Sequence, residues 1–202
     1  MPLKIAFPGT IAASLILSGC AAIPGLGPAP VDAFDISAPL KVEAKRRFSR
    51  TQILVPEPEA LKMLDGEDIA VRLGGNSVQL LKGARWADRL PKLVQARVIE
   101  AFQRSNSFAG VGRPGDGLAI DYQIVIEIRS FEVRVGEAGG DTAHVELFVR
   151  LLNDRNGTVR ASRSFQALTP VTGQGSDAFA NAMNQAFQKT AAEIVSWTSA
   201  SI

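Results

Sequence analysis

The chain has 202 residues, and its 22 lysines and arginines nearly balance its 20 aspartates and glutamates. Proteins that surround nucleic-acid phosphates need a clear basic excess, so this composition argues against a nucleic-acid-binding protein. One cysteine and one histidine supply too few side chains for a transition-metal site or a disulfide framework. We therefore expect partners that are proteins or apolar molecules.

The first 19 residues have the pattern of an export signal. Lys4 precedes an apolar run that is too short to span a bilayer comfortably and that Pro8 and Gly9 interrupt. The run ends in Leu17-Ser18-Gly19-Cys20, which resembles the bacterial lipobox. We predict a lipoprotein signal peptide over residues 1–19 and lipid attachment at Cys20. The alternative is a cysteine placed by chance behind an ordinary signal or an anchor helix.

Lipidation would hold the mature chain on a membrane. The lipobox resemblance implies a diacylglycerol thioether on Cys20 and usually an N-acyl chain, and two or more acyl chains make attachment stable. The next residue is Ala21 rather than aspartate. In enterobacterial lipoproteins this favours the outer membrane, so we expect an outer-membrane lipoprotein that faces the periplasm. Residues 20–33 are rich in proline and glycine and read as a tether, which reaches at most roughly 45–50 Å from Cys20 to Phe34.

Residues 34–202 are the predicted folded domain. Removing residues 1–19 from the 202 leaves 183, enough for one domain with a core and a tether. Arg50–Val55 reads as a strand that Pro56 stops. Residues 68–73 and 77–81 read as two further strands, joined in a hairpin by Gly74-Gly75-Asn76.

Helical spacing of apolar residues follows these strands. It runs from Leu90 to Phe102 and predicts an amphipathic helix from near Asp88 to near Ser105. Asp88 is suited to cap its N-terminus, and Pro91 falls in the first turn, where a missing N–H is harmless.

The second half of the domain predicts a strand meander and a last helix. In residues 122–135 the apolar positions are even-numbered up to Ile128 and odd-numbered from Phe131, so we expect a bulge near Ser130. Two more alternating strands follow after short turns, around residues 145–151 and 159–167. The last helix begins near Ser176 and buries one apolar face. The sequence therefore predicts an α+β fold, with a mostly antiparallel sheet and two amphipathic helices packed on one face.

The motifs do not indicate catalysis. Residues 110–115 match G-x-G-x-x-G, but they follow a helix and lead into a strand, which favours a helix-to-strand loop over a dinucleotide site. His144 lies near a strand start, and no G-x-S-x-G turn accompanies it, so it reads as a solvated or edge-strand histidine. We predict no enzyme activity and no catalytic, cofactor-binding or metal-binding residue.

Two surface features remain as candidates for contacts. Arg85-Trp86 precedes the first helix and is a candidate partner contact, because Trp and Arg are favoured at interfaces. The other interpretation is that Trp86 packs the helix start against the sheet. A basic run lies just after the tether and either touches acidic head groups or forms a solvated loop; it comprises Lys41, Lys45, Arg46, Arg47 and Arg50.

Together these segments resemble one family, the ABC-type transport auxiliary lipoproteins, which includes the lipoprotein of the paraquat-inducible operon. The resemblance covers nearly the whole mature chain. It rests on the lipobox, residues 34–36 and 53–58, the segment Ala84–Pro91 that runs into a Leu/Val-rich helix, residues 121–124, and the C-terminal helix with Trp197. Relatives commonly carry tyrosines before the Arg-Trp pair, whereas this chain has Leu80-Leu81-Lys82-Gly83.

The resemblance implies a function as well as a fold. Such lipoproteins serve beside ABC transporters of lipids and are encoded with mammalian-cell-entry (MCE) domain proteins that bridge the envelope. We therefore expect a non-catalytic accessory that docks an MCE-domain protein, with its ABC permease and ATPase, at the outer membrane. Exposed strand edges or end loops would make the contact, and a homo-oligomer is a further expectation. The alternative is a structural lipoprotein that assists an unrelated outer-membrane assembly.

Overall fold

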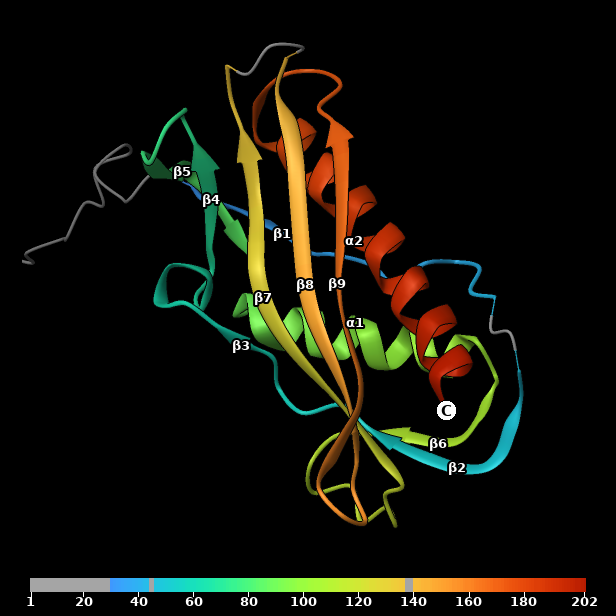
Figure 1. Ribbon diagram of the computed structural model, residues 1–202. Helices are drawn as coiled ribbons and strands as arrows, with labels where there is room; N and C mark the ends of the chain where they lie inside the picture. The colour runs from blue at the N-terminus through green and yellow to red at the C-terminus, as the bar shows by residue number, and fades with distance from the viewer. Residues whose placement is uncertain (1–29, 44–45, 137–139) are drawn as a thin grey trace, which may run out of the picture.

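The computed structural model describes residues 30–43, 46–136 and 140–202 (Figure 1). The predicted signal peptide, Cys20 and most of the tether lie outside the described residues. The elements are β1 (Asp32–Phe34), β2 (Phe48–Leu54), β3 (Glu59–Ala60), the short 3-10 helix η1 (Lys62–Leu64), β4 (Asp68–Arg72), β5 (Val78–Trp86), α1 (Leu90–Arg104), β6 (Phe108–Gly112), β7 (Tyr122–Arg134), β8 (Thr142–Asn153), β9 (Thr158–Pro170) and α2 (Gly175–Ser201).

The long strand β7 organises the sheet. On one side it pairs antiparallel with β8 along nearly its whole length, and β8 pairs antiparallel with β9. On the other side three short strands share its edge in succession: β2 near Tyr122, β3 near Glu127 and β4 near Glu132, all parallel to β7. The predicted α+β class and the β7–β8–β9 meander are confirmed. The sheet is mixed rather than mostly antiparallel, because β1–β5 and β2–β6 are also parallel pairs.

The bulge in β7 lies where the apolar pattern changes phase. The pairing of β7 with β8 shifts register between Ile128 and Ser130. An extra residue at this point keeps Ile128 and Phe131 in the core, and each is only 1% exposed. The prediction of a bulge near Ser130 is therefore confirmed, and its cause is the burial of apolar side chains on both sides of the bulge.

Both helices cover the same side of the sheet (Figure 1). The apolar faces of α1 and α2 join the strands in one core, in which Val98, Phe102, Met183 and Phe187 are fully buried. Pro91 lies in the first turn of α1, as expected. Asp88 is not the cap, because Arg89 occupies the N-cap position and Asp88 accepts a 2.7 Å hydrogen bond from the Arg89 N–H. Neither helix is long and apolar enough to span a membrane.

The glycine-rich motif is partly a strand rather than only a loop. Gly110 and Gly112 lie in β6, which runs parallel to β2, and a turn follows. A Cβ atom on Gly112 would lie 2.6 Å from the Asp116 Oδ2 atom and 2.8 Å from the Leu118 Cδ1 atom. Close packing of the following turn therefore explains a glycine at position 112.

Candidate functional site

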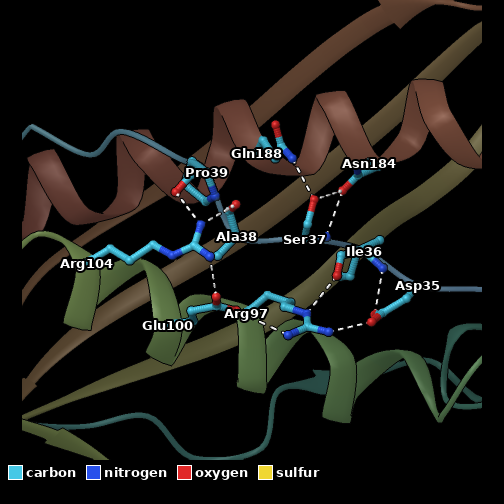
Figure 2. Close-up of polar contacts among 10 residues, drawn as sticks. All are labelled: Asp35, Ile36, Ser37, Ala38, Pro39, Arg97, Glu100, Arg104, Asn184 and Gln188. Atoms are coloured by element: carbon cyan, nitrogen blue, oxygen red, sulfur yellow. Dashed lines mark hydrogen bonds and ion pairs between the residues drawn. The ribbon is translucent and has the colours of Figure 1, made fainter.

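The first candidate site lies near the point where the tether joins the folded domain. Residues 35–39, which we call the N-terminal strap, follow β1 and run between α1 and α2 (Figure 2). Ile36 and Ala38 are 1% and 2% exposed, so the strap is part of the core. The strap backbone leaves the sheet at the end of β1, and side chains of α1 and α2 form hydrogen bonds with its N–H and carbonyl groups.

Two arginines of α1 hold the strap from one side. The Arg97 Nε–H donates to the Ile36 carbonyl oxygen at 2.7 Å, and the same guanidinium pairs with Asp35. The Arg104 guanidinium donates to the Ala38 and Pro39 carbonyl oxygens at 3.0 and 3.1 Å. Glu100 lies between the two arginines and accepts from both (Figure 2).

These contacts stabilise the charged guanidinium of Arg97. Partial burial alone would lower the pKa of Arg97, but the hydrogen bonds and charges of Asp35 and Glu100 together outweigh burial and raise that pKa. A charged donor to a backbone carbonyl is stronger than a neutral one. Arg97 is therefore a firm link between the strap and α1.

Helix α2 holds the strap from the other side. The Ser37 N–H donates to the Asn184 side-chain oxygen at 2.8 Å, and the Gln188 amide donates to the Ser37 hydroxyl at 2.7 Å. The strap is thus fastened to both helices within five residues (Figure 2). The chain that comes from the tether therefore first pairs with β5 through β1 and is then fastened to both helices by the strap.

The Arg85-Trp86 pair lies beside the strap. In the β1–β5 pairing Phe34 is the partner of Trp86, and the Phe34 carbonyl oxygen accepts from the Ala87 N–H at 2.7 Å. Trp86 is only 1% exposed and meets Phe131 edge to face, with 5.5 Å between ring centroids. Its indole is therefore packed in the core and is not presented at the surface. Arg85 stays half exposed and pairs with Glu67 at 3.2 Å.

A second polar cluster lies on the sheet at β4, β7 and β8. Arg72 holds the Glu132 carboxylate with two 2.8 Å hydrogen bonds, and Arg134 adds one at 3.3 Å. Burial alone would raise the pKa of Glu132, but the two arginines outweigh burial and lower that pKa, so Glu132 is ionised. The Arg134 guanidinium also donates to the His144 Nδ1 atom at 2.6 Å.

His144 is buried rather than solvated, contrary to expectation. It is 6% exposed, and burial, together with the charge of Arg134, lowers its pKa. A guanidinium has no acceptor, so Nδ1 must accept and the ring is the neutral tautomer with its proton on Nε2. His144 thus completes the cluster around Glu132. Its position on a strand was predicted, but β8 lies between β7 and β9 and is therefore not an edge strand.

The basic run is only partly described, because Lys45 lies outside the described residues. The Arg46 guanidinium lies 5.5 Å from the centroid of the Phe48 ring, so one member of the run stacks on the start of β2. The described residues contain no group of three or more His, Cys, Asp or Glu side chains placed to hold a metal ion.

The comparisons with known proteins agree with this architecture. A crystal structure of a Xanthomonas campestris protein has a TM-score of 0.77 and 28% identity, and covers 86% of this chain and 96% of that one. A second crystal structure, of an uncharacterized protein, has a TM-score of 0.62 at 13% identity, covers 80% of this chain and 97% of that one, and shows likeness of fold alone.

A similar protein, described as uncharacterized, comes from Bradyrhizobium diazoefficiens. It is 30% identical over 184 residues, which make up 91% of this chain and 49% of the relative, so the chain spans about half the length of that curated relative. Residues 34–195 match the family described as the ABC-type transport auxiliary lipoprotein component. The matched segment begins at Phe34, in β1, and contains the whole strap. The chain therefore belongs to the ABC-type transport auxiliary lipoprotein family.

Proposed function

We propose that this protein is a non-catalytic, lipid-anchored periplasmic accessory of an ABC/MCE-type system that moves lipids between membranes. It docks the transport assembly at the outer membrane. The family match over residues 34–195 carries the proposal, because it covers the folded domain that follows the lipobox-like Leu17–Cys20 segment. The partners would be an MCE-domain protein and the ABC permease and ATPase.

The strap gives the proposed anchor a mechanical role. A lipid on Cys20 would hold the tether at the membrane. The β1–β5 pairing, followed by the strap contacts of Arg97, Arg104 and Asn184, would carry that restraint into the sheet and both helices. The domain would then stand within the roughly 45–50 Å reach of the tether, with a fixed chain entry point beside β5. Such an arrangement suits a component that must hold a partner near one membrane.

The contact face remains part of the proposal. Arg85 is exposed next to the strap and is one candidate contact, whereas the buried Trp86 supports that surface from below. Crosslinking in cells tests the docking role, with photoreactive residues spread over the exposed surface. Adducts to an MCE-domain protein that cluster on one face support it. Adducts only to an unrelated outer-membrane assembly would favour the alternative, a structural lipoprotein.

Anchoring requires a separate test. Mass spectrometry of the mature N-terminal peptide should show an acylated Cys20 as the first residue. Cys20→Ser should release the domain from the membrane fraction or leave the precursor uncleaved. A mature chain that begins elsewhere with an unmodified cysteine would refute the anchor while leaving the family membership intact.

A further inference from the structure

Strand β9 leaves a long free edge on the sheet (Figure 1). It has 13 residues and, among the described strands, pairs only with β8. The Val171 N–H donates to the Asp141 carbonyl oxygen at 2.8 Å just beyond the strand, and the pairing then runs without a shift as far as Ala161. These two facts fix which backbone groups of β9 turn toward β8.

In an antiparallel ladder the backbone groups of alternate residues turn to opposite sides. The outward-turned positions of β9 are therefore Ser162, Ser164, Gln166, Leu168 and Pro170. Pro170 fits this phase, because it has no N–H and prolines in sheets occupy positions where no ladder bond is needed. No other described strand pairs with this side, so a row of N–H and C=O groups is open to a partner.

A hollow lies beside this edge, between β9 and α2. Its volume is about 390 Å³, and its lining is Arg163, Glu193, Ser196, Trp197 and Ala200. Trp197 meets the buried Phe165 ring edge to face, with 5.4 Å between centroids, and the Arg163 guanidinium lies 5.0 Å from the same ring centroid. A tryptophan and an arginine held on one ring are the side chains that most often dominate binding interfaces.

The charge of this edge indicates the chemistry of its occupant. β9 contains Arg160 and Arg163 and no acidic residue. Arg163 and Glu193 line the same hollow but form no ion pair with each other, and Arg163 forms none with any other described residue, so the Arg163 charge is open to a carboxylate of the partner. A two-fold pairing of β9 with β9 of a second copy would bring these arginines of both copies to one seam, which like-charge repulsion disfavours.

We infer that β9 is a docking edge for an extended acidic segment of a partner protein. The segment adds as a strand to β9, inserts an apolar side chain into the Trp197 hollow and sets a carboxylate on Arg163. The inference rests on the proposed function only in that a docking lipoprotein has a protein partner. It names no particular transport component.

Two synthetic peptides test it with the mature lipoprotein in detergent micelles. Both alternate aliphatic residues with charged ones, and the charged residues are glutamate in one peptide and lysine in the other. Amide hydrogen exchange should slow over residues 158–170 with the acidic peptide and stay unchanged with the basic one. No slowing there at millimolar acidic peptide overturns the inference, whichever proteins the lipoprotein is found to bind in cells.

Matched variants locate the contact. Arg163→Glu should weaken acidic-peptide binding by about tenfold, near 1.4 kcal/mol, and favour the basic peptide. Arg113→Glu makes the same charge change beyond β6 and should bind like the parent. Ala200→Trp fills the hollow from an exposed position and should also weaken binding. Equal binding by all three variants contradicts the inference. Slowed exchange of β9 that depends on protein concentration without peptide would instead assign the edge to a second copy.

Discussion

The Arg97 guanidinium donates to the Ile36 carbonyl oxygen at 2.7 Å, so a charged side chain of α1 holds the backbone that leads from the tether. Ile36 is itself 1% exposed, and its carbonyl has little access to water. Loss of the arginine would leave a buried acceptor without its donor, which costs more than the hydrogen bond itself.

Arg97→Ala should therefore lower the free energy of unfolding by about 1–3 kcal/mol. Urea unfolding measures this change, and hydrogen exchange should rise over residues 32–39. Arg113→Ala, an exposed arginine outside the strap, should stay within about 0.5 kcal/mol of the parent. Equal stability of the two variants would mean that the strap is not fastened by Arg97.

Trp86 and Arg85 should behave differently although they are adjacent. Trp86→Ala empties a core position against Phe131 and should cost about 3–5 kcal/mol. Arg85→Ala removes an exposed ion pair with Glu67 and should cost at most about 1 kcal/mol. Thermal and urea unfolding of both variants provide the comparison. If the tryptophan variant were as stable as the arginine variant, the placement of Trp86 in the core would be wrong.

Acid should destabilise the domain through His144. Its pKa is lowered from 6.5 by burial and by the charge of Arg134, so the unfolded chain takes up a proton before the native state does. The native state then binds fewer protons, and the free energy of unfolding falls as the pH drops below about 6.5. His144→Gln should flatten this dependence between about pH 6.5 and 5.

The control for this pH series is the further loss of stability at lower pH, which Glu132 causes rather than His144. Glu132 also has a lowered pKa, because Arg72 and Arg134 outweigh its burial. Its contribution is present above the ordinary glutamate pKa of 4.5 and is lost as the pH falls through the lower native value. The His144→Gln variant should keep this further loss of stability. Parallel stability curves for variant and parent between pH 6.5 and 5 would contradict the assigned role of His144.

The bulge and helix α1 were predictable because each depends on a pattern of apolar residues that are neighbours in the chain. The phase change between Ile128 and Phe131 marked the bulge, and the spacing from Leu90 to Phe102 marked α1. The parallel pairing of β2, β3 and β4 on one edge of β7 was not predictable. These contacts join residues that are far apart in sequence, such as Ala70 and Glu132, and strand periodicity does not specify the direction of pairing.

The candidate sites, too, were predictable where neighbouring residues form a pattern and were not predictable where distant residues meet. The lipobox and the Ala84–Pro91 segment indicated the family, which the match over residues 34–195 confirms. The strap was not recognised from the sequence. Its polar contacts come from Arg97, Arg104 and Asn184, whereas the helices were predicted only from the spacing of their apolar residues. Nor did the sequence show that Arg72 and Arg134 would bury Glu132, since the two arginines meet only through the β4–β7 pairing.

Purification of the native protein from solubilised membranes tests the central claim most directly. The full-length chain, carrying a C-terminal affinity tag, is isolated in mild detergent, and its co-purifying proteins are quantified against the Cys20→Ser variant. We predict an MCE-domain protein together with an ABC permease and ATPase, all reduced in the variant. Recovery of a different outer-membrane complex, with no ABC component, would contradict the proposed transport role.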